Sequence, residues 1–282
     1  SEGIRSLEKG RTFYTSNSGL IELRQEICKW YQRKYNVLYD YKTEALLTVG
    51  GSEGIDVALR AMLDPGDEVI IPEPCYVSYV PCVQLIGAVP VTIELKNENQ
   101  FRLTSEELLA AITDKTKILI LAFPSNPTGA VMTKEDLEPI AKICQEKDIY
   151  VISDEIYSEL TYGGQKHCSI SSLPGMKERT IVINGFSKAY AMTGWRLGYA
   201  LAPEVIAHQM TKIHQFAIMC APTTSQYAAI EAIKNGDADI EKMCKSYDQR
   251  RRFLLKKFEE IGLPCFEPHG AFYVFPCIKE FG

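Results

Sequence analysis

The chain has 282 residues, of which 46% are hydrophobic and 24% charged, so it can bury a substantial core. That length suits one large domain, or a large and a small one. The net charge is −5, and the basic residues of the densest basic run (249–258) alternate with apolar residues as in an amphipathic helix, so we do not expect nucleic acid as a partner. No apolar run is long enough to span a membrane, so we do not expect a membrane as a partner either.

Short apolar runs rich in β-branched residues alternate with helical patterns over most of the chain. Helices are expected at 55–63 and 133–147, the second introduced by Thr133 and Asp136 at the spacing of a capping box. Continuous apolar strands separated by helices predict an α/β fold, with a mainly parallel seven-stranded sheet in a three-layer α/β/α domain. The expected strands are 45–49, 67–72, 89–95, 117–123, 149–154, 180–184 and 196–202.

Beyond about residue 203 the pattern changes to long helices, and strands are expected to resume at 265–277. We therefore place a large domain at 1–239 and assign 240–282 to part of a smaller α+β domain. Apolar residues such as Phe272, Val274 and Phe275 need partners that this short segment does not supply. We expect the small domain to be incomplete and the 282 residues to belong to a longer polypeptide.

Cysteine and histidine usage points to an ordinary reducing compartment. The nine cysteines contain no CxxC pair, and the four histidines have no metal-ligand spacing. No signal peptide opens the sequence. We expect reduced thiols, no metal site and a soluble, cytoplasmic protein.

Polar groups follow four of the expected strands at the point where each strand ends. Gly50 to Ser52 follow 45–49, Asn126 follows 117–123, Asp154 ends 149–154, and Lys188 follows 180–184. Ligands of open α/β sheets bind beyond the carboxyl ends of the strands. These groups are therefore expected to converge on one crevice.

Each group also has a less specific interpretation. The glycine loop can cradle an anion at a helix N-terminus or be a plain tight turn. Asp154 is costly to bury unless it is paired, and it can equally be an N-cap or half of a buried ion pair. A lone lysine is more often a solvated surface residue, but a semi-buried Lys188 would have a lowered pKa and a nucleophilic amine. Arg196, between Trp195 and Leu197, is not in a typical solvent-facing context and suits bidentate phosphate binding.

A ligand that uses a phosphate site, a carboxylate for a ring nitrogen and an amine for a Schiff base is pyridoxal 5′-phosphate. The sequence also resembles a known family through six segments in order: YTSNSGLIELR, VGGSEG, LDPGDEVIIPEPCYVSY, PSNPTG, SDEIY and GFSKAYAMTGWRLGY. It is similar along essentially its whole length to the fold-type I aminotransferases of class I/II, in particular the prokaryotic aspartate/aromatic branch.

The resemblance implies roles for residues that match the family's motifs. Lys188 matches the Schiff-base lysine, and Asp154 matches the carboxylate bonded to the pyridine nitrogen. Tyr157 and Asn126 match the residues near the ring hydroxyl, and Tyr76 matches the aromatic residue that stacks on the ring. At the phosphate, the resemblance implies loop atoms of Gly51, Ser52 and Glu53, chiefly their backbone N–H groups. The side chains of Arg196 and Ser187 complete this implied phosphate site.

Two further implications concern the assembly and the substrate. Tyr14 matches a tyrosine that reaches the phosphate of the neighbouring subunit, which implies a homodimer with shared active sites. Many relatives carry serine or alanine where this chain has Gly185, so a side-chain contact is missing there. The arginine that binds the substrate α-carboxylate in the family is expected outside this sequence.

The implied reaction is a ping-pong transfer of an amino group between an L-amino acid and a 2-oxo acid. In it Lys188 is both the covalent anchor and the general acid/base, while Asp154 and Tyr157 tune the cofactor. A pyridoxal-phosphate-dependent β-lyase on the same fold is an alternative, because cofactor residues alone do not fix the reaction. A non-catalytic module that binds the cofactor or an amino acid is a second alternative.

Overall fold

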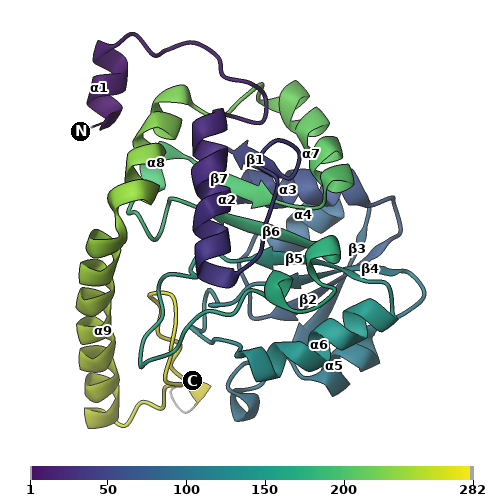
Figure 1. Ribbon diagram of the computed structural model, residues 1–282. Helices are drawn as coiled ribbons and strands as arrows, with labels where there is room; N and C mark the ends of the chain where they lie inside the picture. The colour runs from purple at the N-terminus through teal and green to yellow at the C-terminus, as the bar shows by residue number, and fades with distance from the viewer. Residues whose placement is uncertain (1, 280–282) are drawn as a thin grey trace.

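The computed structural model describes residues 2–279, and its centre is one seven-stranded sheet (Figure 1). The strand order is β1-β7-β6-β5-β4-β2-β3. Each strand lies within two residues of its predicted position, which confirms the predicted sheet: β1 (Ala45–Thr48), β2 (Glu68–Glu73), β3 (Val89–Glu94), β4 (Thr116–Leu121), β5 (Tyr150–Asp154), β6 (Thr180–Gly185) and β7 (Gly198–Leu201).

The sheet is mainly parallel, as predicted, with one reversed strand. Strands β3, β2, β4, β5 and β6 pair in parallel, whereas β7 pairs antiparallel with both β6 and β1. The carboxyl ends of β4, β5 and β6 therefore meet at one edge of the sheet, where a ligand crevice is expected.

Helices cover both faces of the sheet, giving three layers (Figure 1). Alternate strand residues point to opposite faces, so Ile118 and Ile120 pack with helices α3, α4 and α7, while Leu119 and Leu121 pack with α5 and α6. Helices α2 and α8 cover the other end of that second face. The helices are α1 (Glu2–Glu8), α2 (Ile21–Tyr35), α3 (Gly50–Met62), α4 (Tyr79–Leu85), α5 (Ser105–Ala111), α6 (Lys134–Glu146), α7 (Glu204–Ala217), α8 (Thr223–Asn235) and α9 (Asp237–Glu260). Short 3₁₀ turns are η1 (Asn97–Asn99), η2 (Ile170–Ser172), η3 (Lys177–Arg179) and η4 (Thr193–Trp195).

Two local details decide where helices begin. Helix α3 starts at residue 50, five residues before the predicted start, because Gly50 takes a positive φ of 74° that turns the chain directly from β1 into the helix. The capping box of α6 is confirmed. The Asp136 amide donates to the Thr133 hydroxyl at 3.3 Å, and the Thr133 amide donates to the Asp136 carboxylate at 2.8 Å.

The prediction of strands at 265–277 is wrong. In that segment the structure has only two isolated bridges, Thr161 to Gly270 and Cys265 to Pro276. Pro264, Pro268 and Pro276 lack an amide proton, so they interrupt any ladder of strand hydrogen bonds. The predicted boundary at residue 240 falls inside helix α9. The nine cysteines form no disulfide within residues 2–279. Over residues 2–279, no helix combines the length and the apolar character needed to cross a membrane.

Candidate active site

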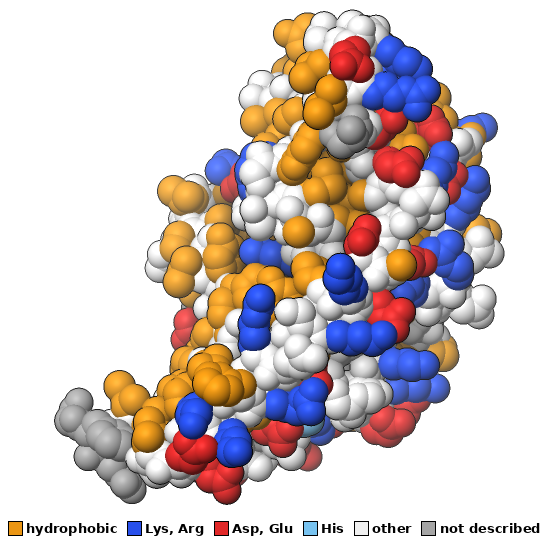
Figure 2. Space-filling model, turned by 90° about the vertical axis from the view of Figure 1, so that its left-hand side faces the viewer, with side chains coloured by type: hydrophobic (Ala, Val, Ile, Leu, Met, Phe, Trp, Pro, Cys, Tyr) orange, Lys and Arg blue, Asp and Glu red, His pale blue; other side chains and the backbone are white. Residues whose placement is uncertain are grey.

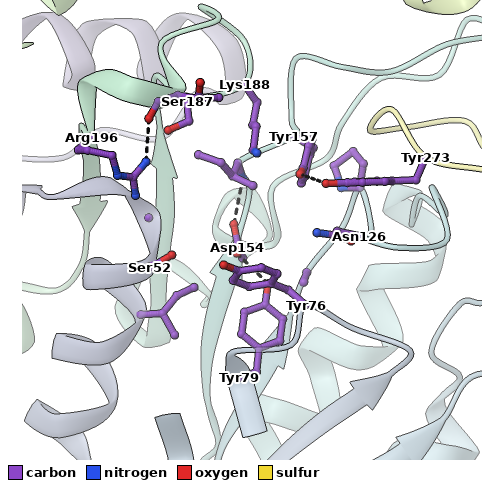
Figure 3. A pocket seen from close by; sticks show the side chains of 16 residues that line it. Ser52, Tyr76, Tyr79, Asn126, Asp154, Tyr157, Ser187, Lys188, Arg196 and Tyr273 are labelled. Carbon is purple, nitrogen blue, oxygen red and sulfur yellow. Dashed lines mark hydrogen bonds between the residues drawn. The ribbon is translucent and has the colours of Figure 1, made fainter. Parts of the chain in front are cut away.

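A cavity of about 220 Å³ opens at the carboxyl ends of β4, β5 and β6, beside the first turn of α3 (Figure 3). In Figure 3 the Lys188 amine lies between two ends of this cavity. Arg196, Ser187 and Ser52 gather at one end, and Tyr157, Tyr273 and Asn126 at the other. Every predicted site residue except Glu53 and Tyr14 lines the cavity: Gly51, Ser52, Tyr76, Asn126, Asp154, Tyr157, Ser187, Lys188 and Arg196.

Glycines let three backbone segments meet at the Arg196 end of the cavity. A Cβ on Gly198 would lie 2.6 Å from the carbonyl carbon of Gly50 and 2.7 Å from the nitrogen of Gly51. A Cβ on Gly185 would lie 2.8 Å from the Cα of Gly198, so neither serine nor alanine fits at this position without a shift. This contact brings the free amides of the first turn of α3 to the cavity, where they can bind an anion.

Arg196 completes this anion site. Its backbone is left-handed (φ 50°), and its Nη1 donates to the Thr193 carbonyl at 2.9 Å. The side chain is exposed, contrary to the expectation from its apolar neighbours, because the left-handed turn directs it to the cavity rather than into the core. Ser187 beside it is buried. An arginine, a hydroxyl and helix N-terminal amides form a donor set that suits phosphate.

Lys188 has a lowered pKa, because partial burial disfavours its charge and Arg196 repels it, while Asp154 opposes both effects. Its Nζ lies 5.5 Å from the centre of the Tyr157 ring and 5.4 Å from that of Phe272. The lysine is thus not a solvated surface residue. Its environment increases the fraction of the neutral, nucleophilic amine.

Asp154 is buried at the end of β5, and burial raises the pKa of its carboxyl group. Tyr79 Oη donates to Asp154 Oδ2 at 2.8 Å and the Ile156 amide donates to Oδ1 at 3.1 Å, and both hydrogen bonds oppose the rise. Among residues 2–279 no cation lies within ion-pair distance of this carboxylate, so the buried ion pair considered above is not formed. The carboxylate instead faces the cavity.

Two cavity tyrosines were missed by the sequence analysis. Tyr79 lies three residues after Tyr76, and this spacing could have indicated that both side chains reach the same site. Tyr273 comes from the segment after α9, and its hydroxyl lies 2.7 Å from that of Tyr157. Nothing in the local sequence indicates that second contact, because the two tyrosines are 116 residues apart.

Glu53 and Tyr14 lie outside the cavity lining. The Glu53 carboxylate turns away from the cavity to accept from the Val49 amide and to contact Nδ1 of the buried His214 at 2.6 Å. Only the backbone of Glu53 is thus in a position to act at the anion site. Tyr14 is 77% exposed on the segment between α1 and α2.

The fold and the site define a class of enzyme, and comparison with known proteins agrees with it. The family model "Aminotransferase class I and II" matches residues 2–280. An aspartate aminotransferase of Pyrococcus abyssi is 46% identical over 98% of this chain and 72% of its own length. An aromatic-amino-acid aminotransferase of Thermococcus litoralis is 44% identical over the same shares. The crystal structure of an aromatic aminotransferase from Pyrococcus horikoshii superposes with a TM-score of 0.96 at 45% identity, covering 98% of this chain and 74% of that one. The chain belongs to the class I and II aminotransferase family and is an aminotransferase.

Proposed function

We propose that this aminotransferase binds pyridoxal 5′-phosphate in the cavity and moves an amino group between an L-amino acid and a 2-oxo acid by a ping-pong mechanism. The observation that carries the proposal is the arrangement in one cavity of an amine of lowered pKa, a buried carboxylate and an anion site. When bound there, pyridoxal phosphate accepts the amino group and draws electrons away from the substrate Cα.

The glycine-lined end of the cavity fits the phosphate of this cofactor. The backbone amides of Gly51, Ser52 and Glu53 belong to the first turn of α3, which has no intrahelical acceptors for them. Ser187 and Arg196 add a hydroxyl and a guanidinium at the same end. The close backbone contact between β7 and α3, which leaves no room for a Cβ on Gly198, fixes the first turn of α3 at the cavity.

The opposite end of the cavity fits the ring. Asp154 would bind the pyridine nitrogen, and its raised pKa makes it a suitable partner for a weakly basic nitrogen, since the two share a proton. Asn126 and Tyr157 would contact the ring oxygen, and Tyr76 would cover one face of the ring. Tyr79 would keep the Asp154 carboxylate oriented through its 2.8 Å hydrogen bond.

Lys188 would hold the cofactor covalently and then move a proton at the substrate Cα. A lysine at its ordinary pKa is almost fully protonated near neutral pH and is a poor base. Burial and the repulsion from Arg196 lower that pKa and increase the fraction of free amine. The amine also lies between the anion site and the aromatic end of the cavity, where the reacting carbon of the substrate would bind (Figure 3).

We also propose that two copies of the chain associate and that Tyr14 of each reaches the other's anion site. Thr223 Oγ1 donates to the Phe13 carbonyl at 2.6 Å, and Asn17 Nδ2 donates to the Met219 carbonyl at 2.9 Å, so the segment that bears Tyr14 is held against the loop before α8. Figure 2 looks onto the face that carries α1, α8 and α9, where apolar side chains gather. Ile4 and Leu7 of α1 are 58% and 56% exposed, which suits a protein partner better than water.

The test is a set of half-reactions with the purified protein loaded with pyridoxal phosphate. Each amino acid of a panel is added alone, and absorption follows conversion of the aldehyde form of the cofactor to its amine form. We expect conversion with at least one amino acid, release of the matching 2-oxo acid, and reversal by a second oxo acid. Release of ammonia and pyruvate without the amine form would contradict the proposal, as would failure to bind the cofactor.

The dimer is tested separately by sedimentation over a range of protein concentrations. Affinity for the cofactor should fall as the dimer dissociates, because each site would lose one Tyr14. Tyr14→Phe should weaken cofactor binding in the dimer without dissociating it. Cofactor affinity that is equal in monomer and dimer would exclude a shared site.

A further inference from the structure

Tyr273 and Tyr157 form a pair at the aromatic end of the cavity (Figure 3). Their hydroxyl oxygens lie 2.7 Å apart, and their rings meet edge to face with centroids 5.8 Å apart. Tyr157 is only 5% exposed, and the Phe272 ring packs against it at 5.3 Å. The Tyr157 hydroxyl therefore has a fixed neighbour as well as the open cavity in front of it.

The backbone around Tyr273 is anchored to the loops that carry the other cavity residues. The Ala271 amide donates to the Leu160 carbonyl and the Gly270 amide to the Gly129 carbonyl, both at 2.9 Å. A Cβ on Gly270 would lie 2.4 Å from Cβ of Pro124, so the segment lies directly on the loop that carries Asn126. Tyr273 is thus held in place from both sides of the aromatic end.

We propose that Tyr273 is a positioning residue that donates its hydroxyl proton to Tyr157 and so leaves the Tyr157 proton for the ring oxygen of the cofactor. This inference rests on the proposed function, which places the ring oxygen beside Tyr157. Either tyrosine can be the donor in the observed pair. A phenol has one proton to donate and lone pairs to accept with, so the direction of this bond decides what Tyr157 offers to the cavity.

The direction follows from what else each hydroxyl can reach. Within residues 2–279, the Tyr273 hydroxyl has no hydrogen-bond partner besides Tyr157. With an anionic ring oxygen in the cavity, Tyr157 donates to that oxygen and Tyr273 to Tyr157, and both protons are used. A phenol that accepts a hydrogen bond also becomes a stronger donor, because hydrogen bonds in a chain polarise one another. Tyr273 thereby strengthens the contact of Tyr157 with the ring.

Other groups also face Tyr157 and influence its environment. They are the Lys188 amine on the loop after β6, the Asp154 carboxylate at the end of β5, and the Tyr76 phenol before α4. Burial and the contact with Tyr273 raise the pKa of Tyr157, and the carboxylate acts in the same direction. Tyr157 therefore stays a neutral donor over the working range of pH.

The test is the pH titration of the absorption band of the cofactor-loaded protein. A donor to the ring oxygen stabilises its negative charge, so the proton shared between that oxygen and the lysine nitrogen leaves at a lower pH. Tyr157→Phe should therefore shift the midpoint upward. Tyr273→Phe should shift it upward by a smaller amount, roughly 0.3 to 1 pH unit. The double variant should titrate like Tyr157→Phe alone, because Tyr273 acts only through Tyr157.

Tyr247→Phe is the matched control. The Tyr247 ring packs on Phe272 at 5.5 Å but does not line the cavity, so loss of its hydroxyl should leave the midpoint unchanged. A Tyr273→Phe midpoint equal to that of the parent, in a series where Tyr157→Phe does shift it, would overturn the inference. So would a double variant in which the two shifts add. No shift in Tyr157→Phe would instead contradict the proposed place of the ring oxygen.

A second variant guards against a general loss of structure in Tyr273→Phe. Incorporation of 3-fluorotyrosine at position 273 keeps the ring and the hydroxyl but makes the phenol more acidic and hence a stronger donor. The midpoint should then move downward, opposite to the Phe variant. Both changes are nearly isosteric with tyrosine, so damage to the fold would not move the midpoint downward for 3-fluorotyrosine and upward for Tyr273→Phe. An upward shift in both would refute the donor role.

Discussion

Replacing Tyr79 with phenylalanine removes one oxygen from a buried hydrogen bond to Asp154, and its effect on stability should depend on pH. Tyr79 is 2% exposed, and its hydroxyl donates to Oδ2 at 2.8 Å. A hydrogen bond to an ionised partner contributes about 1.5–3 kcal/mol, and one between neutral groups about 0.5–1.5 kcal/mol. The loss should therefore be larger where Asp154 is ionised.

The direction of this pH dependence of stability follows from the raised pKa of Asp154. The folded protein holds this proton more tightly than the unfolded chain, in which aspartate has a pKa of about 3.9. The stability contributed by Asp154 is thus full below the unfolded pKa and is lost as the pH rises through the folded pKa. Because Tyr79 stabilises the carboxylate, Tyr79→Phe raises the folded pKa further and enlarges that loss.

The assay is urea unfolding of the cofactor-free parent and variant from about pH 4 to about pH 8. The difference in unfolding free energy between parent and variant should grow with pH. It should rise from about 0.5–1.5 kcal/mol, where Asp154 is neutral, to about 1.5–3 kcal/mol, where Asp154 is ionised. Tyr190→Phe is the control, because the buried Tyr190 hydroxyl has no hydrogen-bond partner among the described residues and should show a small, pH-independent change. A Tyr79→Phe difference that stays constant over this range would refute the reasoning.

Three further substitutions test the site. Lys188→Ala should abolish turnover and leave the thermal unfolding temperature nearly unchanged, while the protein still binds pyridoxal phosphate non-covalently; activity near that of the parent would exclude the assigned role. Asp154→Asn should lower the rate with saturating cofactor far more than it lowers cofactor affinity, because the anion site is intact; the opposite pattern in titrations would count against Asp154 as the ring partner. Gly198→Ala places a Cβ 2.6 Å from the Gly50 carbonyl carbon, so it should weaken cofactor binding at least tenfold, or about 1.4 kcal/mol, and an unchanged dissociation constant would show that the cradle tolerates the shift.

Most of the strands were predictable because they are largely apolar runs buried on both faces, whereas in the edge strand β3 only Ile93 is buried. Ile118 to Leu121, for example, alternate between the two helix layers and are all apolar. The reversed direction of β7 was not predictable from its composition. That direction depends on the connection after β6, where Ala191 and Arg196 take left-handed conformations that the side chains alone do not announce.

The C-terminal segment shows the limit of reading apolar alternation as strand. The apolar run Phe272 to Phe275 has no partner strand beside it among the described residues. The surrounding prolines have no amide proton to donate to a strand ladder. The Phe272 ring packs instead on Tyr157 and Tyr247, and the Phe275 ring packs on Phe101. The division of the chain near residue 240 stays a prediction.

The candidate site was predictable where it follows from strand ends, and not where it depends on contacts distant in sequence. Asn126, Asp154 and Lys188 converge because parallel strands bring their carboxyl ends together. The contact of Glu53 with His214 spans 161 residues. It takes the Glu53 side chain away from the anion site and depends on how α7 packs on α3, which the sequence pattern leaves open.

The most direct measurement of the central claim is to locate the lysine that carries the cofactor. The protein is loaded with pyridoxal phosphate, reduced with borohydride to fix the covalent link, digested, and mapped by mass spectrometry. We predict a single modified peptide that contains Lys188, and no modification in the Lys188→Ala variant. Modification of a different lysine, or an unmodified Lys188 in fully loaded protein, would contradict the account.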